Sequence, residues 1–341
     1  MKNILVTGGL GFIGSHTVVE LTQAGYSPII VDNLSNSTLS VLDNIAQIIG
    51  EKPTFYKGDF QDRALLEKVL SEQLIDGVIH FAAYKAVGES VEKPLAYYQN
   101  NVAGLVNLLE VLTENKVSNL VFSSSCTVYG EPDKLPVTED APIKPAASPY
   151  GATKQMCENI IHDSCRAPRM ELRAISLRYF NPIGAHESGL IGELPIGVPQ
   201  NLVPFVTQTA AGVRKELTVF GDDYDTPDGS NIRDYIHVVD LAKAHIKALE
   251  YIHDKQPGFY DVCNIGTGQG SSVLDVIKTF EEATGVKLSY KIGARRPGDV
   301  VKTYASVHKA KRILGWEAEK TLSNALQDAW QWQKRLNKEI K

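Results

Sequence analysis

The chain has 341 residues, 43% of them hydrophobic, and carries a formal net charge of −5. This length and apolar content predict a globular protein with one large domain or two smaller ones. The sequence has no basic block, which argues against a nucleic-acid surface, and the apolar run 4–6 near its start is too short for a signal peptide core or a membrane span.

The four cysteines have neither the paired spacing of metal ligands nor the density of a disulfide scaffold. They are Cys126, Cys157, Cys165 and Cys263. Reduced thiols are typical of the cytoplasm. We therefore expect a cytoplasmic protein that binds no metal, no nucleic acid and no membrane.

In chain order, short apolar runs alternate with helical patterns through the first half of the sequence. The expected strands are 3–7, 28–32, 54–57, 77–81, 119–124 and 174–179, and the expected helices between them are 15–24, 65–72, 102–115 and 150–165. This alternation is typical of the α/β class, and it predicts a Rossmann-type, doubly wound parallel sheet covered by helices.

Beyond residue 180 the alternation ends, and Gly, Pro and Asn become frequent over 181–201 and 221–231. Helical patterns return at 238–251, 273–284 and 322–332. We therefore expect a Rossmann domain at 1–180 and a smaller C-terminal α/β region at 181–341 that mainly holds a ligand, with some of its chain returning to the first domain.

A glycine-spaced turn at Gly8, Gly11 and Gly14 follows the first strand and opens the first helix, as dinucleotide binding requires. Glycines permit a tight turn and let backbone N–H groups approach a pyrophosphate. Asp32 ends the second strand, where a carboxylate can bind both ribose hydroxyls and repel a 2′-phosphate. The 1–180 domain is therefore expected to bind NAD rather than NADP, although Asp32 could also simply start the turn with Asn33.

Two more strand ends supply candidates for contact with the cofactor. Asp59, which follows the third strand, could meet the adenine amino group. The small Ala82 and Ala83 end the fourth strand unit, and Lys85 lies in the adjoining loop. His80, within the same strand, is expected to be a packed residue rather than a ligand.

The carboxyl end of the fifth strand carries a run of serines that ends at Ser125. Tyr150 and Lys154 are four residues apart on an expected helix, so the ammonium group can lie near the phenol and favour its ionised form. An ionised tyrosine can act as a base, and Ser125 could share a substrate hydroxyl with it. No Gly-x-Ser-x-Gly motif surrounds the serines, which weighs against a hydrolase, and Cys126 is expected to be a small packing residue.

With these motifs the chain resembles the extended short-chain dehydrogenase/reductase family, and within it the enzymes that epimerise UDP-hexoses at C4. The closer resemblance rests on the blocks 81–90, 178–185, 201–204, 233–238 and 295–299, which span most of the chain in family order. It implies an isomerase with bound NAD that oxidises the hexose at C4 and returns the hydride to the opposite face, interconverting UDP-glucose and UDP-galactose.

The resemblance also implies which residues form the site, with Arg233 and Arg296 clamping the diphosphate. The catalytic residues would be Ser125, Tyr150 and Lys154. Those expected to bind NAD are Gly8, Gly11, Phe12, Ile13, Gly14, Asp32, Asn33, Asp59, Phe60, Phe81, Ala82, Ala83, Lys85, Asn100, Ser123, Tyr150, Lys154 and Tyr179. Those expected to bind the UDP-hexose are Ser125, Tyr150, Asn181, Asn201, Leu202, Val219, Phe220, Arg233, Tyr235, Arg296, Asp299 and Thr303.

Thr303 departs from the family pattern, because it falls where a bulky tyrosine closes the sugar pocket of enzymes restricted to non-acetylated hexoses. We therefore hypothesise a second activity, the interconversion of UDP-GlcNAc and UDP-GalNAc. Tyr304 could still reach into the same pocket.

Two other functions remain open on the sequence. One is a related nucleotide-sugar enzyme, a 4,6-dehydratase or a decarboxylase, although a dehydratase would normally carry an acid pair where Cys126 and Thr127 follow Ser125. The other is an NAD-sensing regulator without catalysis, which the retained Ser125, Tyr150 and Lys154 argue against. The resemblance further implies a homodimer formed through the helices at 102–115 and 150–165.

Overall fold

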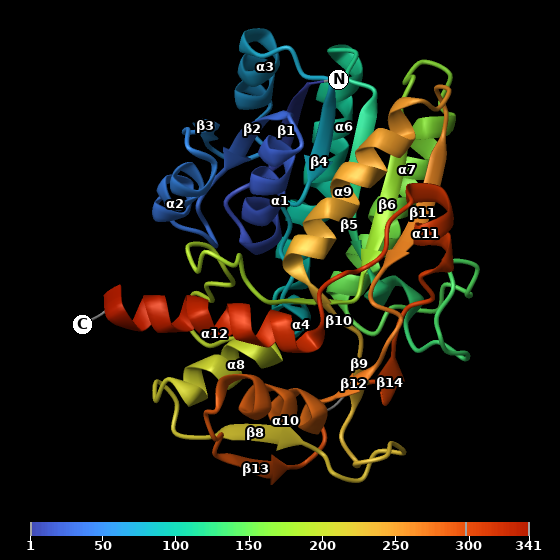
Figure 1. Ribbon diagram of the computed structural model, residues 1–341. Coiled ribbons are helices and arrows are strands. Elements are labelled where there is room, and N and C mark those ends of the chain that lie inside the picture. Colours follow the sequence, from blue (N-terminus) through green and yellow to red (C-terminus); the bar gives the residue numbers. More distant parts are fainter. Residues whose placement is uncertain (1, 297–298, 340–341) are drawn as a thin grey trace.

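The computed structural model describes residues 2–296 and 299–339. Its centre is a seven-stranded sheet in the order β11-β6-β5-β4-β1-β2-β3, and every neighbouring pair is parallel (Figure 1). The strands are β1 (Asn3–Thr7), β2 (Ser27–Asp32), β3 (Thr54–Lys57), β4 (Gly77–His80), β5 (Asn119–Ser125), β6 (Arg173–Tyr179) and β11 (Tyr260–Ile265). This arrangement confirms the expected Rossmann-type parallel sheet.

Helices cover both faces of the sheet, and two apolar clusters fill the space beneath them. One face carries α1 (Phe12–Gln23), α2 (Ser40–Ile49), α9 (Val238–His253) and α11 (His308–Leu314). The other carries α3 (Arg63–Glu72), α6 (Gly104–Glu114) and α7 (Pro149–Arg166). Strands buried on both sides explain the nearly continuous apolar runs in the sequence.

Strand β11 and helices α9 and α11 come from the C-terminal half of the chain, yet they pack on the N-terminal sheet. β11 pairs with β6 in register from Tyr260↔Ala174 to Ile265↔Tyr179. This strand is not among those expected from the sequence, because its pattern of Tyr-Asp-Val-Cys-Asn-Ile interrupts the apolar run with polar residues.

Several shorter elements complete the N-terminal half: α4 (Val87–Glu92), α5 (Pro94–Tyr97), a π-helix (Tyr98–Ala103) and a 3-10 turn (Cys126–Tyr129). The helix expected at 102–115 begins as an α-helix only at Gly104, because the π-helix occupies the preceding six residues. π-Helical turns are rare and are often found at functional sites. This one contains Asn100, a predicted cofactor-binding residue.

The C-terminal region contains three small sheets and a third apolar cluster. β7 (Asn181–Ile183) pairs with β10 (Tyr235–His237), β8 (Leu217–Phe220) pairs with β13 (Tyr290–Gly293), and β9 (Ile232–Arg233) lies between β12 (Ser271–Ser272) and β14 (Lys302–Thr303). Helices α8 (Leu202–Ala210), α10 (Val273–Thr284) and α12 (Leu322–Glu339) pack around them. Figure 1 shows this region at one end of the large sheet, below the carboxyl ends of its strands.

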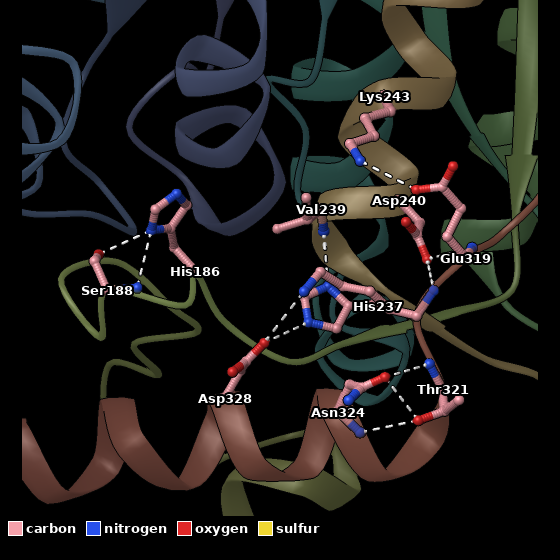
Figure 2. A network of polar contacts seen from close by, with 11 residues as sticks. His186, Ser188, His237, Val239, Asp240, Lys243, Glu319, Thr321, Asn324 and Asp328 are labelled. Carbon is pink, nitrogen blue, oxygen red and sulfur yellow. Dashed lines mark hydrogen bonds and ion pairs between the residues drawn. The ribbon is translucent and has the colours of Figure 1, made fainter. Parts of the chain in front are cut away.

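Helix α12 is attached to the start of α9 by polar contacts (Figure 2). The ring of His237 accepts the Val239 N–H at Nδ1, so Nε2 donates to Asp328 of α12 at 3.0 Å. The carboxylate of Asp240 accepts the backbone N–H groups of Glu319 and Lys320. These bonds hold the C-terminal helix against both the Rossmann sheet and the smaller region.

Candidate functional site

The glycine turn between β1 and α1 is shaped to receive a phosphate. A Cβ atom added to Gly14 would lie 2.2 Å from the carbonyl oxygen of Gly8, and one added to Gly8, whose φ is +70°, would lie 2.9 Å from the nitrogen of Ala82. Gly11 is the N-cap of α1 and offers no side chain to its first turn, so the N–H groups at Phe12 and Ile13 remain free for an anion. The residues of this turn therefore fit the pyrophosphate of a dinucleotide.

Asp32 lies beside this turn at the end of β2 and is 8% exposed. One carboxylate oxygen accepts the N–H of Leu10 at 3.0 Å, and the other accepts the N–H of Leu34 at 2.8 Å and the hydroxyl of Ser37 at 3.0 Å. Asp32 thus both shapes the turn and presents a carboxylate next to the glycines. Asp32 can therefore both start the turn with Asn33 and bind the ribose of the cofactor.

The next strand end brings Asn33 and Asp59 together, with the amide of Asn33 donating to the Asp59 carboxylate at 2.8 Å. Gln61 also donates to Asp59, and its side chain reaches the amide oxygen of Asn100 at 3.1 Å. Phe60 is 4% exposed and its ring packs against Gly104, so only its backbone is available to a ligand.

The three predicted catalytic residues meet at the carboxyl ends of β5 and β6. Lys154 is 3% exposed and donates from Nζ to the carbonyl oxygen of Ser123 at 2.6 Å. A hydrogen bond to Ser125 acts to lower the pKa of Tyr150, but burial outweighs it and raises that pKa to about 12. Burial also lowers the pKa of Lys154 to about 8. The lowering of the Tyr150 pKa that the Tyr-Lys spacing predicts is therefore not produced by the side chains of the protein alone.

Ser125 is oriented by Thr127, a residue to which the sequence analysis gave no role. Its hydroxyl oxygen accepts both the N–H of Thr127 at 3.2 Å and the hydroxyl of Thr127 at 3.0 Å. With its acceptor positions used in this way, the hydroxyl hydrogen of Ser125 is directed elsewhere. It is available to Tyr150 or to a substrate hydroxyl.

Tyr179 is held at the end of β6 by His245 of α9, a second residue that the sequence analysis missed. The imidazole donates from Nδ1 to the carbonyl of Leu241 at 2.8 Å, so Nε2 accepts the hydroxyl of Tyr179. The ring of Phe81 lies 4.7 Å from that of His245. No local pattern in the sequence points to His245, because its partners come from β6 and from the loop after β4.

The predicted phosphate-binding residues of the C-terminal region gather around one carboxylate. Asp299 is bonded to Arg296 at 3.1 Å and lies 3.8 Å from the nearest guanidinium nitrogen of Arg233. The guanidinium of Arg296 lies over the ring of Phe220, 5.0 Å from its centre. Two guanidinium groups and an aromatic face side by side suit a nucleoside diphosphate. Residues 297 and 298 of the same block lie outside the described residues.

The strand pairing of β9 with β14 shows that Thr303 and Tyr304 point to opposite faces of this small sheet. Thr303 pairs with Arg233, and paired residues point to the same face of a sheet, so Thr303 lies on the Arg233 side. Tyr304 points to the other face, where its ring contacts the position of Gly270. Of the two residues, Thr303 is the one directed toward the predicted phosphate clamp.

The remaining predicted substrate residues differ in what they can offer. Asn181 pairs with Tyr235 across β7 and β10, which places both side chains on one face. Val219 is 1% exposed in the apolar cluster, so only its backbone is available. Asn201 is the N-cap of α8, but its amide donates to Glu193 instead of capping the helix.

One cavity, of about 340 Å³, lies behind α7, away from the predicted catalytic and binding residues. Its wall includes the buried pair of Glu158 and Arg178, joined by bonds of 2.9 and 2.7 Å. Glu158 also accepts the hydroxyl of Ser124 at 2.6 Å. This pair fixes α7, and with it Tyr150, against β5 and β6.

Within residues 2–296 and 299–339, no helix is long and apolar enough to cross a membrane, and no group of three or more His, Cys, Asp or Glu side chains is placed to hold a metal. All four cysteines are free.

The fold and the site together define an NAD-binding enzyme of the short-chain dehydrogenase/reductase class. A family model described as GDP-mannose 4,6 dehydratase matches residues 5–329. The chain is 51% identical over 332 residues to a UDP-glucose 4-epimerase of Haemophilus influenzae, and 52% identical over 333 residues to that of Yersinia enterocolitica; in both cases 97% of each chain is covered.

Two solved structures are similar along almost the whole chain. A UDP-glucose 4-epimerase from Stenotrophomonas maltophila, with bound NAD and formylated UDP-arabinopyranose, has a TM-score of 0.96 and 46% identity, covering 99% of this chain and 100% of that one. One from Bifidobacterium longum, in complex with NAD+ and UDP, has a TM-score of 0.94 and 49% identity, with 98% of each chain covered. The chain therefore belongs to the extended short-chain dehydrogenase/reductase family, and within it to the UDP-glucose 4-epimerases.

Proposed function

We propose that this protein interconverts UDP-glucose and UDP-galactose, as an NAD-dependent isomerase acting at C4 of the hexose. The observation that carries this conclusion is the convergence of Ser125, Tyr150 and Lys154 at the same carboxyl edge of the sheet as the glycine turn, in a chain about half identical to UDP-glucose 4-epimerases along its length. A related dehydratase or a regulator without catalysis accounts less well for these two findings, the three converging residues and the identity to UDP-glucose 4-epimerases. Cys126 and Thr127 follow Ser125, and the acid pair of a dehydratase is missing there.

When bound, NAD would supply the hydride acceptor and a positive charge on its nicotinamide ring. Residues 1–180 would hold it as the cofactor domain, with the first turn of α1 on the pyrophosphate and Asp32 on the adenosine ribose. Asp59 would lie toward the adenine, and Lys154 and Tyr179 toward the nicotinamide riboside. Phe60 would contribute its backbone, as its buried ring requires.

Tyr150 would take the proton of the hexose 4-hydroxyl while the bound NAD accepts the C4 hydrogen as hydride, so that C4 becomes a ketone. The N–H and the hydroxyl of Thr127 both donate to the Ser125 oxygen, so the hydroxyl hydrogen of Ser125 is directed toward this group. A base working near neutral pH requires the pKa of Tyr150 to fall by several units from about 12, so positive charge next to the phenol is essential. When C4 is reduced again on its opposite face, Tyr150 would give the proton back to the oxygen at C4.

Inversion requires the ketone to turn over without leaving, so binding must be concentrated on the nucleotide. Residues 181–341 would mainly provide this binding, while β11 and α9 belong to the cofactor domain. Arg233, Arg296 and Asp299 would bind the diphosphate, with Phe220 beside them. Asn181, Asn201, Leu202 and Tyr235 would complete the nucleotide site, and Val219 would contribute only its backbone.

A second activity, on UDP-GlcNAc and UDP-GalNAc, is supported by the β9–β14 pairing. A threonine rather than a tyrosine lies on the Arg233 side of the sheet, and Tyr304 lies on the other. The smaller side chain leaves more room for a 2-acetamido group beside the sugar.

We also propose a cytoplasmic homodimer that serves galactose metabolism. Free cysteines suit a reducing compartment. Val106 on α6 and Met156 on α7 are 39% and 44% exposed, on the two helices expected to pair. A dimeric mass in solution that falls to a monomeric mass in Val106→Glu would support this interface, and a monomeric wild-type protein would contradict it.

The test of the main activity is to incubate the purified protein, without added cofactor, with UDP-galactose and separately with UDP-GalNAc, and to follow the C4 epimers by NMR. Conversion of UDP-galactose is expected, and conversion of UDP-GalNAc would support the second activity. The Tyr150→Phe protein is the control for contaminating epimerase. No conversion of either sugar, even after NAD is added, would overturn the proposal.

A further inference from the structure

Glu193 occupies a loop that is held firmly against the C-terminal helix. The loop is closed by a bridge between Ala185 and Gly192, and a Cβ atom on Gly192 would lie 2.5 Å from the ring of Trp332. The indole N–H of Trp332 donates to the carbonyl oxygen of Glu193 at 3.0 Å. The backbone at Glu193 is thus fixed, and its side chain is only 13% exposed.

The carboxylate of Glu193 binds two residues from opposite parts of the site. Its Oε1 atom accepts the amide of Asn201 at 2.6 Å and lies 3.4 Å from the ammonium of Lys85. Asn201 begins α8, which is expected to bind the nucleotide. Lys85 follows Ala82, against which the cofactor turn packs at Gly8. One oxygen atom therefore connects the expected nucleotide end of the site to its cofactor end.

The two contacts differ in strength. The bond to Asn201 is short, charge-assisted and mostly shielded from water, so it belongs to the stronger class of hydrogen bonds. The pair with Lys85 is longer, and the Lys85 side chain is 50% exposed, which makes it weak by itself. Its value lies in its position, because it joins residues 1–180 to residues 181–341 across the site.

We propose that Glu193 is a positioning residue that couples the nucleotide-binding start of α8 to Lys85 and thereby retains the ketone while it turns over. The inference rests on the proposed function and deepens it. The ketone is held in the site only through its UDP group. It stays there as long as the start of α8 and the loop that carries Lys85 remain at a fixed distance from each other. Loss of the coupling frees the ketone to leave after oxidation, and the electrons then remain on the bound cofactor as reduced nicotinamide.

The experiment compares Glu193→Gln, Glu193→Ala, Lys85→Met and the double variant Lys85→Met/Glu193→Gln, each as the full chain with its bound cofactor. Glutamine keeps an oxygen acceptor for Asn201 and loses the charge that attracts Lys85. Two quantities are measured: the reduced nicotinamide that accumulates during turnover of UDP-galactose, by its near-ultraviolet absorbance, and the dissociation constant of UDP, by calorimetry. Glu216→Gln, which breaks the surface pair with Lys291 at 2.6 Å, is the matched control.

Glu193→Gln is expected to accumulate several-fold more reduced nicotinamide than wild type while binding UDP with nearly unchanged affinity. Glu193→Ala should in addition weaken UDP binding by about tenfold, the loss expected for one charge-assisted hydrogen bond. The double variant should accumulate no more reduced nicotinamide than the more affected of Lys85→Met and Glu193→Gln, because each change breaks the same contact between Lys85 and Glu193. Glu216→Gln should behave as wild type.

Wild-type accumulation in Glu193→Gln, or additive effects in the double variant, would overturn the proposal. Thermal melting of each variant shows whether it is folded. Glu193→Gln is expected to melt as wild type does, because glutamine has nearly the volume of glutamate. Failure of the proposed function is distinguishable, because the wild-type protein itself would then convert no UDP-galactose.

Discussion

Lys154 reaches across from α7 to donate a 2.6 Å hydrogen bond to the backbone carbonyl of Ser123, two residues before the serine that faces Tyr150. This bond fixes the ammonium group below the phenol, 5.9 Å from the centre of its ring. The buried pair of Glu158 and Arg178 fixes the same helix one turn further on. The tyrosine predicted to be catalytic is therefore placed by backbone and core contacts that exist in the protein itself.

Replacement of Tyr150, the proposed base, should slow turnover strongly while the protein still retains NAD. In Tyr150→Phe the ring volume is kept and only the hydroxyl is lost, so kcat should fall by about 10² to 10⁴, the usual contribution of a general base. NMR of UDP-galactose conversion measures the rate, and the NAD content of the purified protein measures retention. Activity within tenfold of wild type would mean that another group takes the proton.

The ionisation of Lys154 should leave a signature in the pH dependence of stability. Burial lowers its pKa to about 8 from its usual value of 10.5, so between these values the unfolded chain binds more protons and the stability of the fold rises with pH. Lys154→Met removes this contribution. The free energy of unfolding in urea should therefore rise for wild type relative to Lys154→Met between about pH 8 and pH 10.

The comparison of the two proteins cancels the titration of Cys165, whose pKa is raised by burial and acts in the opposite direction over the same range. Parallel stability curves for wild type and Lys154→Met would show that the ammonium group is not desolvated.

The cofactor turn should tolerate no side chain at Gly14. A methyl group there would lie 2.2 Å from the carbonyl oxygen of Gly8, so the turn must open and the N–H groups lose their alignment. Gly14→Ala should lose at least tenfold in NAD affinity, measured by calorimetry. Gly88→Ala is the matched control, because no heavy atom lies within 4 Å of the added carbon, and it should bind NAD as wild type does.

A bulky residue at position 303 should narrow the range of sugars. Because Thr303 lies on the Arg233 side of β14, Thr303→Tyr should lower kcat/KM for UDP-GalNAc by at least tenfold and change that for UDP-galactose by less than about threefold. Tyr304→Phe, on the opposite face, should change neither. Equal losses on both sugars in Thr303→Tyr would show that the residue acts on nucleotide binding rather than on the acetamido group.

The local signals in the sequence were sufficient for the first six strands, the glycine turn and the helix that carries Tyr150 and Lys154. Alternating periods and glycine positions obey short-range rules of backbone geometry and burial, so they are readable within a few residues. The helix at 273–284 was likewise expected at its observed bounds from its apolar pattern, and the structure shows that Ser272 and Asp275 form a capping box at its start.

The tertiary structure alone decided which distant residues meet. β11 becomes the seventh strand only by pairing with β6, and Thr303 is distinguished from Tyr304 only by the register of two-residue strands, which carry no periodicity. His245 under Tyr179, and Glu193 between Lys85 and Asn201, depend on contacts between segments from 8 to 108 residues apart. The raised pKa of Tyr150 follows from its burial, a property of the whole fold that the Tyr-x-x-x-Lys spacing does not contain.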